Sequence, residues 1–152
     1  MKQTSNGFRG EYSFLSNFHP CKIEYMGLHF ESVEIAFQGA KCELFSEAQL
    51  FTKFTAHESS KAKKLGRKIK MRSDWEQVKL KVMEELLRIK FSDSKLSSML
   101  IDTGGVELIE FNDWGDRFYG VCRGVGRNEL GKLLMKIREE FCNHASGMGE
   151  IK

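Results

Sequence analysis

The sequence predicts an α+β fold in which helices dominate and the strands are few and short. Helical periodicity covers most of the chain, and the strand-like stretches do not alternate with helices as they do in a doubly wound sheet. With 152 residues, 41% of them hydrophobic, and a single proline, the chain can form one core without interrupting its helices. We expect one compact domain over residues 1–152, with a core at about 8–143 and frayed termini.

The first third of the chain changes from an extended to a helical pattern. Residues 1–30 are rich in aromatic and turn-forming residues and look extended, and two short strands are expected around Met26 and Gly27. From Ser32 the helical period begins, with apolar residues at spacings of three and four. Those residues are Val33, Ala36, Phe37 and Ala40.

Two capping-box spacings predict helix starts in the middle of the chain. Ser46 and Gln49 form the first pair, and Ser73 and Glu76 the second. Between them lies a polar helix that is expected to end near Gly66. The helix after the second pair is the most strongly periodic. Its apolar face comprises Trp75, Val78, Val82, Leu86 and Ile89, widened by Leu80, Met83 and Leu87.

The last third is predicted to contain two helices and one strand. A short helix precedes Gly104 and Gly105, a strand covers residues 106–111, and a loop leads to a helix that begins near Asn128. The apolar side of that helix comprises Leu130, Leu133, Leu134, Ile137 and Phe141. We expect the tail over residues 143–152 to be frayed.

Composition narrows the function classes. The net charge of +3 permits an anionic ligand without demanding a nucleic-acid partner. The four cysteines and four histidines lack zinc-site spacing, so we expect no metal, and reduced thiols indicate a cytoplasmic protein. No apolar run approaches the length of a membrane span, and the N-terminus lacks the apolar segment of a signal peptide. The sequence leaves the oligomeric state open.

Glu34, Gln38 and Lys41 recur at helical spacing beside the apolar face of the helix that follows Ser32. We call these three residues the polar stripe. An acid, an amide and an amine in one line suit a polar reaction site. The alternative is the solvated margin of a helix, with at most a weak surface pair.

Three other stretches are candidates for ligand binding, each with a plainer alternative. Residues 120–131 combine glycines and arginines before a helix N-terminus and suit either a phosphate or a flexible loop. Residues 111–120 combine aromatics with acids and suit either base stacking or a buried loop. Residues 61–72 contain seven basic residues, a pattern that is more often a solvated helix than a nucleic-acid patch.

Five motifs in order resemble the NADAR family, the YbiA-like N-glycosidases, over roughly residues 8–138. They are FLSNFHP, SVEIAFQGAK, GRKIKMRSDWEQVKLKVMEELLRIKF, LIEFNDWGDRFYG and GRNELGKLLMKIR. The resemblance implies a compact α+β fold without metal or redox cofactor. It implies cleavage of the bond between a ribose and a nitrogenous leaving group. The expected ligands are ADP-ribose-containing molecules, including ADP-ribosylated guanine in nucleic acid, or phosphoribosylamino compounds of riboflavin synthesis.

The resemblance also assigns candidate site residues. Glu34 matches the family's catalytic glutamate, Lys41 its lysine, and Asp116 the acid of its acidic-aromatic motif. Glu34 or Asp116 would stabilise the positive charge on the ribose, and Lys41 would capture an opened ribose as a Schiff base. The matched substrate-binding residues are Asn17, Phe18, Gln38, Arg67, Trp114, Tyr119, Gly120 and Asn128.

Two departures from the family pattern keep other functions open. Ile35 stands where the pattern has histidine, and Tyr119 stands where it has tryptophan. The loss of a histidine beside Glu34 would fit a protein that binds ADP-ribose or an NAD derivative without catalysis. A nucleic-acid binding module that uses residues 61–72 is the third alternative.

Overall fold

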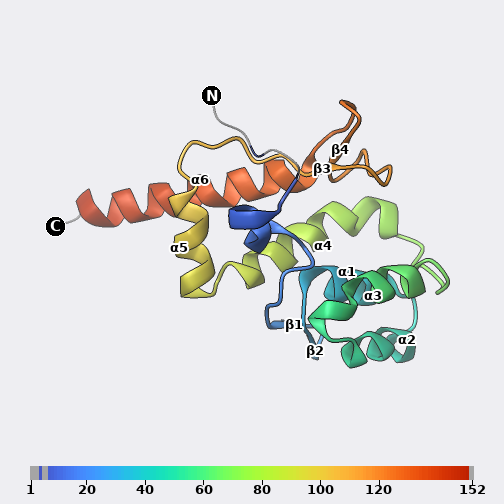
Figure 1. Ribbon diagram of the computed structural model, residues 1–152. Helices are drawn as coiled ribbons and strands as arrows, with labels where there is room; N and C mark the ends of the chain where they lie inside the picture. Colours follow the sequence, from blue (N-terminus) through green and yellow to red (C-terminus); the bar gives the residue numbers. More distant parts are fainter. Residues whose placement is uncertain (1–3, 5–6, 151–152) are drawn as a thin grey trace. The chain divides into compact units, whose positions relative to one another are not determined.

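The structure, a computed structural model, describes residue 4 and residues 7–150, with side chains through residue 144. Its contacts divide the chain into two units (Figure 1). The central unit comprises residues 17–90, and the terminal unit joins residues 1–16 to residues 91–152. Helices dominate and the strands are short, which confirms the predicted α+β class. The single domain over residues 1–152 stays a prediction.

The central unit begins with the predicted hairpin. Strands β1 (Ile23–Tyr25) and β2 (Leu28–Phe30) pair antiparallel, with Ile23 opposite Phe30. Met26 and Gly27 both have positive φ, at 56° and 73°, as a tight two-residue hairpin turn requires. The turn predicted at these two residues is therefore confirmed.

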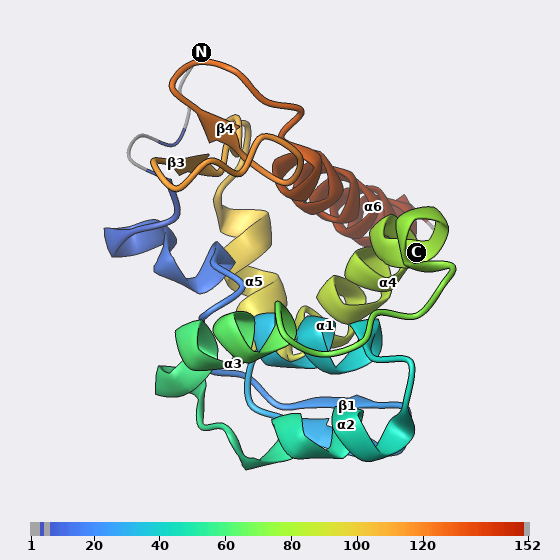
Figure 2. The same ribbon diagram turned by 90° about the vertical axis from the view of Figure 1, so that its right-hand side faces the viewer.

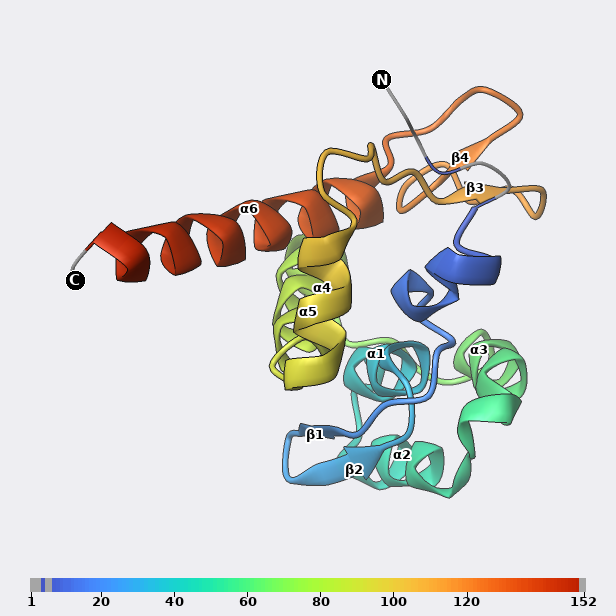
Figure 3. The same ribbon diagram turned by 60° about the vertical axis from the view of Figure 1, so that its left-hand side comes forward.

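Helix α1 (Val33–Lys41) is the centre of this unit and lies against α2, α3 and α4. Figure 3 shows α1 nearly end-on, with α2 and α3 beside it. Its apolar face is buried as predicted, and Val33, Ile35 and Ala36 are fully inaccessible to solvent. The side chain of Ser32 caps the helix by accepting a hydrogen bond from the backbone N–H of Ile35, at 3.2 Å.

Helices α2 (Phe45–Leu50) and α3 (Ser59–Gly66) follow, with 3₁₀ turns at Phe51–Lys53 and Ala56–Glu58 between them. The capping box predicted at Ser46 is wrong, because α2 starts at Phe45 behind Leu44 and has no side-chain cap. A backbone bond from the N–H of Glu43 to the carbonyl of Lys70 holds the chain just before this start. The end of α3 at Gly66 is confirmed.

Helix α4 (Trp75–Lys90) begins two residues after Ser73, one residue later than the second capping box places it. Its buried face includes most of the predicted apolar residues, and the ring of Trp75 packs on that of Phe37 at a centroid distance of 4.9 Å. The sequence did not predict the burial of Lys90, whose side chain is 1% exposed.

The terminal unit starts with a 3₁₀ helix, Gly10–Leu15, where the sequence predicted extended chain. This turn buries the consecutive residues Phe14 and Leu15 together, whereas a strand would direct them to opposite faces. The predicted strand over residues 106–111 is also mostly wrong. Instead of pairing in a sheet, Ile109 exchanges hydrogen bonds with the side chain of Thr4, both at 2.8 Å.

Helices α5 (Ser94–Asp102) and α6 (Glu129–Glu150) pack against each other in this unit. Of the predicted strand only Phe111 is in a strand, at the start of β3 (Phe111–Asn112). Strand β3 pairs parallel with β4 (Val121–Cys122), which the sequence did not predict. Figure 2 shows β3 and β4 beside each other. Helix α6 reaches Glu150 and so includes most of the predicted tail, whose fraying stays a prediction.

Within the described part of the chain, none of the helices combines the length and the apolar character that a membrane span needs. The same residues contain no cluster of three or more histidine, cysteine or acidic side chains able to hold a metal ion.

Candidate functional site

The polar stripe on α1 is buried. Glu34 is 7% exposed and Gln38 6%, and Lys41 is half-buried. A solvated helix margin would leave these side chains in water, so the plainer alternative for the stripe is excluded. Burying an acid, an amide and an amine on one helix costs free energy unless each group is paired or hydrogen-bonded.

Two contacts position the N-terminal end of the stripe. The backbone N–H of Glu34 donates to the carbonyl of Asn17 at 3.0 Å, so the segment before β1 lies against the first turn of α1. The hydroxyls of Ser32 and Ser59 share a hydrogen bond of 2.8 Å, which joins the start of α1 to the start of α3.

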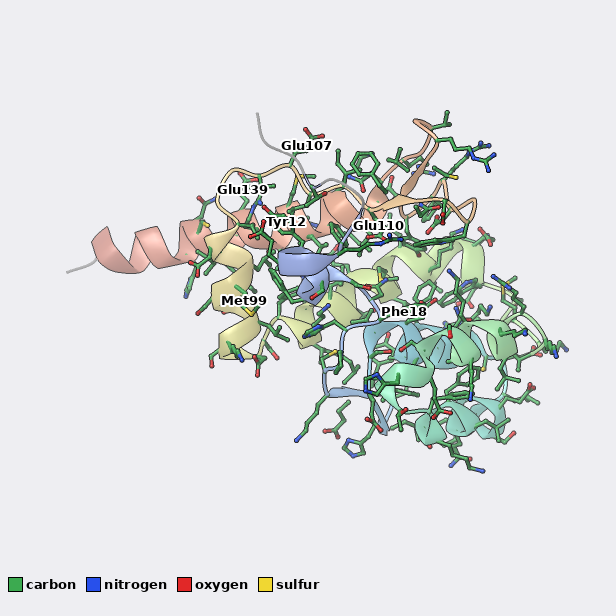
Figure 4. The ribbon with its side chains drawn as sticks, in the orientation of Figure 1. Tyr12, Phe18, Met99, Glu107, Glu110 and Glu139 are labelled. Atoms are coloured by element: carbon green, nitrogen blue, oxygen red, sulfur yellow. The ribbon has the colours of Figure 1, made fainter. Side chains whose placement is uncertain are left out.

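The predicted ligand residues Asn17 and Phe18 lie beside this end of α1. Asn17 donates its amide to the sulfur of Met83 at 3.6 Å, and its Oδ1 is buried without a hydrogen-bond partner. Phe18 is labelled in Figure 4 and is 41% exposed, so its ring is accessible beside these buried polar residues. An exposed ring at this place suits stacking against a planar group.

Lys41 occupies the C-terminal end of the stripe. Burial lowers the pKa of its amine, the nearby Glu34 carboxylate raises it, and Arg67 lowers it further. These interactions place Glu34 and Arg67 within electrostatic reach of Lys41. The neighbouring thiol of Cys42 is unsuited to act as a nucleophile, because burial raises its pKa to about 11.

Helix α3 approaches the middle of the stripe. It ends at Gly66, where a Cβ atom would overlap Oε1 of Gln38 and lie 2.7 Å from its Cδ. Arg67 follows at the exposed end of α3. The structure therefore brings together Glu34, Gln38, Lys41 and Arg67 in the central unit, as their shared role in the resemblance requires.

The remaining predicted residues belong to the terminal unit, and Asp116 organises a loop there. One oxygen of its carboxylate, Oδ1, accepts hydrogen bonds from the backbone N–H groups of Phe118 and Tyr119, both at 3.0 Å. The side chain of Asn112 holds the backbone of Asp116. Its Oδ1 accepts a hydrogen bond from the N–H of Asp116 at 3.0 Å, and its Nδ2 donates to the carbonyl of Asp116 at 2.8 Å. No pattern in the sequence indicates this role of Asn112.

Asn128 and Gly120 also support the backbone of this loop. Asn128 has a φ of 53°, accepts from the N–H of Glu110 at 3.0 Å and donates to the carbonyl of Leu108 at 2.9 Å. At Gly120 a Cβ would overlap the carbonyl of Glu110. The structure shows what these residues hold in place, and their contact with substrate stays a prediction.

Aromatic side chains give the loop two different surfaces. Trp114 is 53% exposed, next to Gly115 with a φ of 92°. Tyr119 packs edge-on against Phe118 at 4.7 Å, and the guanidinium of Arg127 lies over the Phe118 ring at 4.7 Å. Trp114 is therefore the more accessible stacking surface within this unit.

Ile35, the departure from the family pattern, is fully buried among the core side chains. Since neighbouring residues on a helix point about 100° apart, its side chain does not share the direction of the polar stripe. Packing in the core therefore explains isoleucine at position 35 where the family pattern has histidine. With isoleucine there, Glu34 and Lys41 remain within electrostatic reach of each other.

Comparison with known proteins finds relatives that match most of this chain. The family model described as the NADAR domain matches residues 5–142. The N-glycosidase Npun_R5314 of Nostoc punctiforme is 33% identical over 143 residues, covering 91% of both chains. A riboflavin biosynthesis protein of Vibrio vulnificus is 36% identical over 142 residues. The alignment covers 88% of this chain but 37% of that protein, so the chain spans little more than a third of its length.

A solved structure supports the fold as well. The NMR structure of the Escherichia coli protein YbiA superposes with a TM-score of 0.80 at 29% sequence identity, covering 95% of this chain and 89% of that one. Matching a family model over residues 5–142, and sharing its fold with YbiA, the chain belongs to the NADAR family.

Proposed function

We propose that the protein is an N-glycosidase, a hydrolase that cleaves the bond between a ribose and a nitrogenous leaving group. The observation that carries the proposal is the buried Glu34 carboxylate with the half-buried Lys41 amine in electrostatic reach of it on the same helix. Relatives named N-glycosidase, including the Nostoc punctiforme protein and YbiA, support the same reaction class.

Glu34 is the residue we assign to charge stabilisation. Cleavage of an N-glycosidic bond develops positive charge on C1 and the ring oxygen of the ribose, and a carboxylate held beside that charge accelerates the reaction. Because Glu34 is buried, its charge acts through a medium less polar than water and is screened less. Asp116 would then orient the attacking water or deliver the proton that the leaving nitrogen gains. Its Oδ1 atom already holds the backbone of its own loop.

Lys41 offers a covalent route. An amine with a lowered pKa is neutral in a larger fraction of molecules, and only the neutral amine is nucleophilic. Its nitrogen would add to C1 of a ring-opened glycoside, where C1 is joined to the leaving nitrogen as an imine, and so form a geminal diamine. Proton transfer to the leaving nitrogen then breaks its bond to C1, releases the base as an amine and leaves an imine between C1 and Lys41. Water hydrolyses that imine and frees the sugar and the lysine amine.

The substrate we propose is an ADP-ribosyl N-glycoside, such as ADP-ribosylated guanine in nucleic acid, or a phosphoribosylamino compound. Arg67 beside Lys41 supplies a cation for the phosphates of either ligand. The name of the Vibrio vulnificus relative favours the phosphoribosylamino compound, and the basic residues 61–72 favour the nucleic acid. We place the reaction in the cytoplasm, because none of the four cysteines, all of them in described positions, forms a disulfide.

The test is the release of base and sugar from both substrates. Purified protein is incubated with an oligonucleotide carrying ADP-ribose on guanine and, separately, with a 5-phosphoribosylamino pyrimidine. We expect release from at least one of them. Folded protein that releases neither contradicts the proposal. Calorimetric binding of ADP-ribose without turnover would identify the protein as a non-catalytic binder, and salt-dependent binding of unmodified DNA would identify a nucleic-acid module.

A second experiment tests the role of Lys41. Borohydride added in the presence of ADP-ribose reduces an imine to a stable amine, so peptide mass spectrometry should find the sugar attached at Lys41. The control is Lys41→Met, which keeps much of the side-chain volume and lacks the amine. Sugar attached only at other lysines would contradict the covalent route through Lys41. The N-glycosidase activity itself is decided separately, by the release assay.

A further inference from the structure

The carboxamide of Gln38 has an unusual environment. Its side chain is 6% exposed, Oε1 is buried without a hydrogen-bond partner, and no described residue bonds to Nε2. Nε2 is not among the buried unsatisfied atoms, so this end of the amide retains contact with solvent. Leaving a buried carbonyl oxygen unsatisfied costs stability, and such groups in native proteins call for an explanation.

Gly66 explains why the amide can occupy this position. A Cβ at residue 66 would overlap Oε1 of Gln38, and would lie 2.7 Å from its Cδ and 3.3 Å from its Cγ. Gly66 does not have a left-handed φ, so the backbone would accept alanine there. Within a helix alanine is more favourable than glycine. The reason for glycine at this position is therefore the space that the amide of Gln38 occupies.

The orientation of this amide has a consequence for the site. Gln38 stands between Glu34 and Lys41 on the polar stripe, one helical turn from each. With Oε1 directed at Gly66, the accessible Nε2 is a hydrogen-bond donor in the same line as the acid and the amine.

We propose that Gly66 is a positioning residue for the substrate. The space at Gly66 holds the carboxamide of Gln38 so that Nε2 donates a hydrogen bond to an oxygen of the bound ribose. This inference rests on the proposed N-glycosidase function and adds to it a residue on α3 that makes no contact with the sugar itself.

The first test is a thermal double-mutant cycle of Gly66→Ala, Gln38→Ala and the double variant. In the Gln38→Ala background nothing obstructs the new methyl group, so Gly66→Ala should raise the melting temperature by roughly 3 °C through helix preference. In the wild type the displaced amide should cancel that gain. Equal shifts in both backgrounds would overturn the positioning contact.

The matched control is Gly105→Ala. Gly105 has nothing within 4 Å of an added Cβ and no left-handed φ, so the same substitution there should leave binding and turnover unchanged. It separates the effect of the Gly66–Gln38 contact from the general effect of replacing glycine.

The second test is steady-state kinetics with the ADP-ribosylated oligonucleotide. Gly66→Ala and Gln38→Ala should each raise KM about tenfold, the loss of one hydrogen bond, and the double variant should be no worse than either. A merely structural role for Gly66 would make the effects multiply. A normal KM in Gly66→Ala would overturn the proposal.

If the wild type cleaves neither the oligonucleotide nor the phosphoribosylamino pyrimidine, the proposed function fails, and the donation to ribose is overturned with it. If it cleaves the pyrimidine alone, the kinetic comparison is made with that substrate. The thermal cycle requires no ligand. It still decides, in that event, whether Gly66 holds the side chain of Gln38, so the two failures are distinguishable.

Discussion

The polar residues of the two units differ in what they bond to. In the terminal unit, the side chains of Asp116, Asn112 and Asn128 form hydrogen bonds with nearby backbone groups of the same unit. In the central unit, Gln38 and Lys41 are withdrawn from water without such bonds, and burial lowers the pKa of Lys41. The terminal residues stabilise a conformation, whereas the central residues cost stability.

The difference indicates where chemistry is more readily carried out. A side chain whose atoms are already bonded must break those bonds before it can serve a substrate. A buried side chain that has lost its hydrogen bonds to water and formed few with the protein can form them with a bound ligand, which lowers the free energy of the complex. We therefore propose that the central unit carries the reaction and that the polar residues of the terminal loop hold their own backbone.

Glu34→Gln should produce the largest effect. The amide keeps the shape of the side chain and removes its charge, so we expect kcat to fall about 10³-fold, or about 4 kcal/mol, with ADP-ribose binding retained. Stopped-assay release of base measures the rate, and calorimetry measures binding. Glu31→Gln, an exposed position just before α1, is the matched control. A near-normal rate in Glu34→Gln would assign the charge stabilisation to another residue.

Lys90 tests the cost of burial in the central unit. Burial lowers the pKa of its amine from 10.5 to about 8, and proximity to Cys21 opposes that change. The unfolded state therefore binds more protons between pH 8 and 10.5, and the free energy of unfolding should rise with pH across this window, by about 3 kcal/mol. Below pH 8 the cost is fully present.

Lys90→Met isolates this contribution from other groups that titrate at high pH. The variant should be more stable than the wild type at pH 7, and its advantage should shrink by about 3 kcal/mol by pH 10.5. Denaturant unfolding at a series of pH values measures both. Lys81→Met, at an exposed position of the same helix, should show a difference that is flat with pH. A flat difference for Lys90→Met would contradict the cost of burial.

The local parts of the fold could be predicted from the sequence. Periodicity located α1, α3 and α4, and Met26–Gly27 located the hairpin, because these features depend on residues a few positions apart. The errors involve distant partners. Ile109 bonds to Thr4, 105 residues away, and β4 forms only where β3 is already in place. No local pattern in the sequence encodes such pairings.

The candidate site was predicted to a similar extent. Helical spacing identified the polar stripe, and the family resemblance predicts a reaction site at its residues. Spacing alone did not show that Glu34 and Gln38 are buried, because that depends on α3 and α4 packing against α1. The role of Gly66 was also unpredictable, since a glycine at the end of a helix is usually explained by the turn that follows.

Asn128 tests the supporting role of the terminal loop. Asn128→Ala removes two hydrogen bonds to the backbone and places alanine at a φ of 53°, so we expect a loss of about 2 to 3 kcal/mol in the free energy of unfolding. Asn128→Gly tolerates the φ and should lose less. Denaturant titration measures both. Unchanged stability with a raised KM would instead support the contact with substrate that the sequence predicted.

Trp114 is the side chain for which the contrast between the two units is weakest. It belongs to the terminal unit, yet it is exposed and accessible to a ligand. At 53% exposure its removal should change the free energy of unfolding by less than about 0.5 kcal/mol. If its ring stacks on a base, Trp114→Ala should weaken binding of the ADP-ribosylated oligonucleotide by about 1 kcal/mol, roughly fivefold, and Trp114→Phe should recover part of it.

Val125→Ala, an exposed apolar position in the same unit at 57%, controls for general loss of apolar surface and should leave affinity unchanged. Fluorescence anisotropy with the labelled oligonucleotide measures all three variants. If Trp114→Ala binds as the wild type does, the terminal unit contributes support alone and the contrast between the units is complete. If Trp114→Ala binds more weakly, the terminal unit also contacts the leaving base. The contrast between the units then applies only to Asp116, Asn112 and Asn128, whose side chains bond to the backbone.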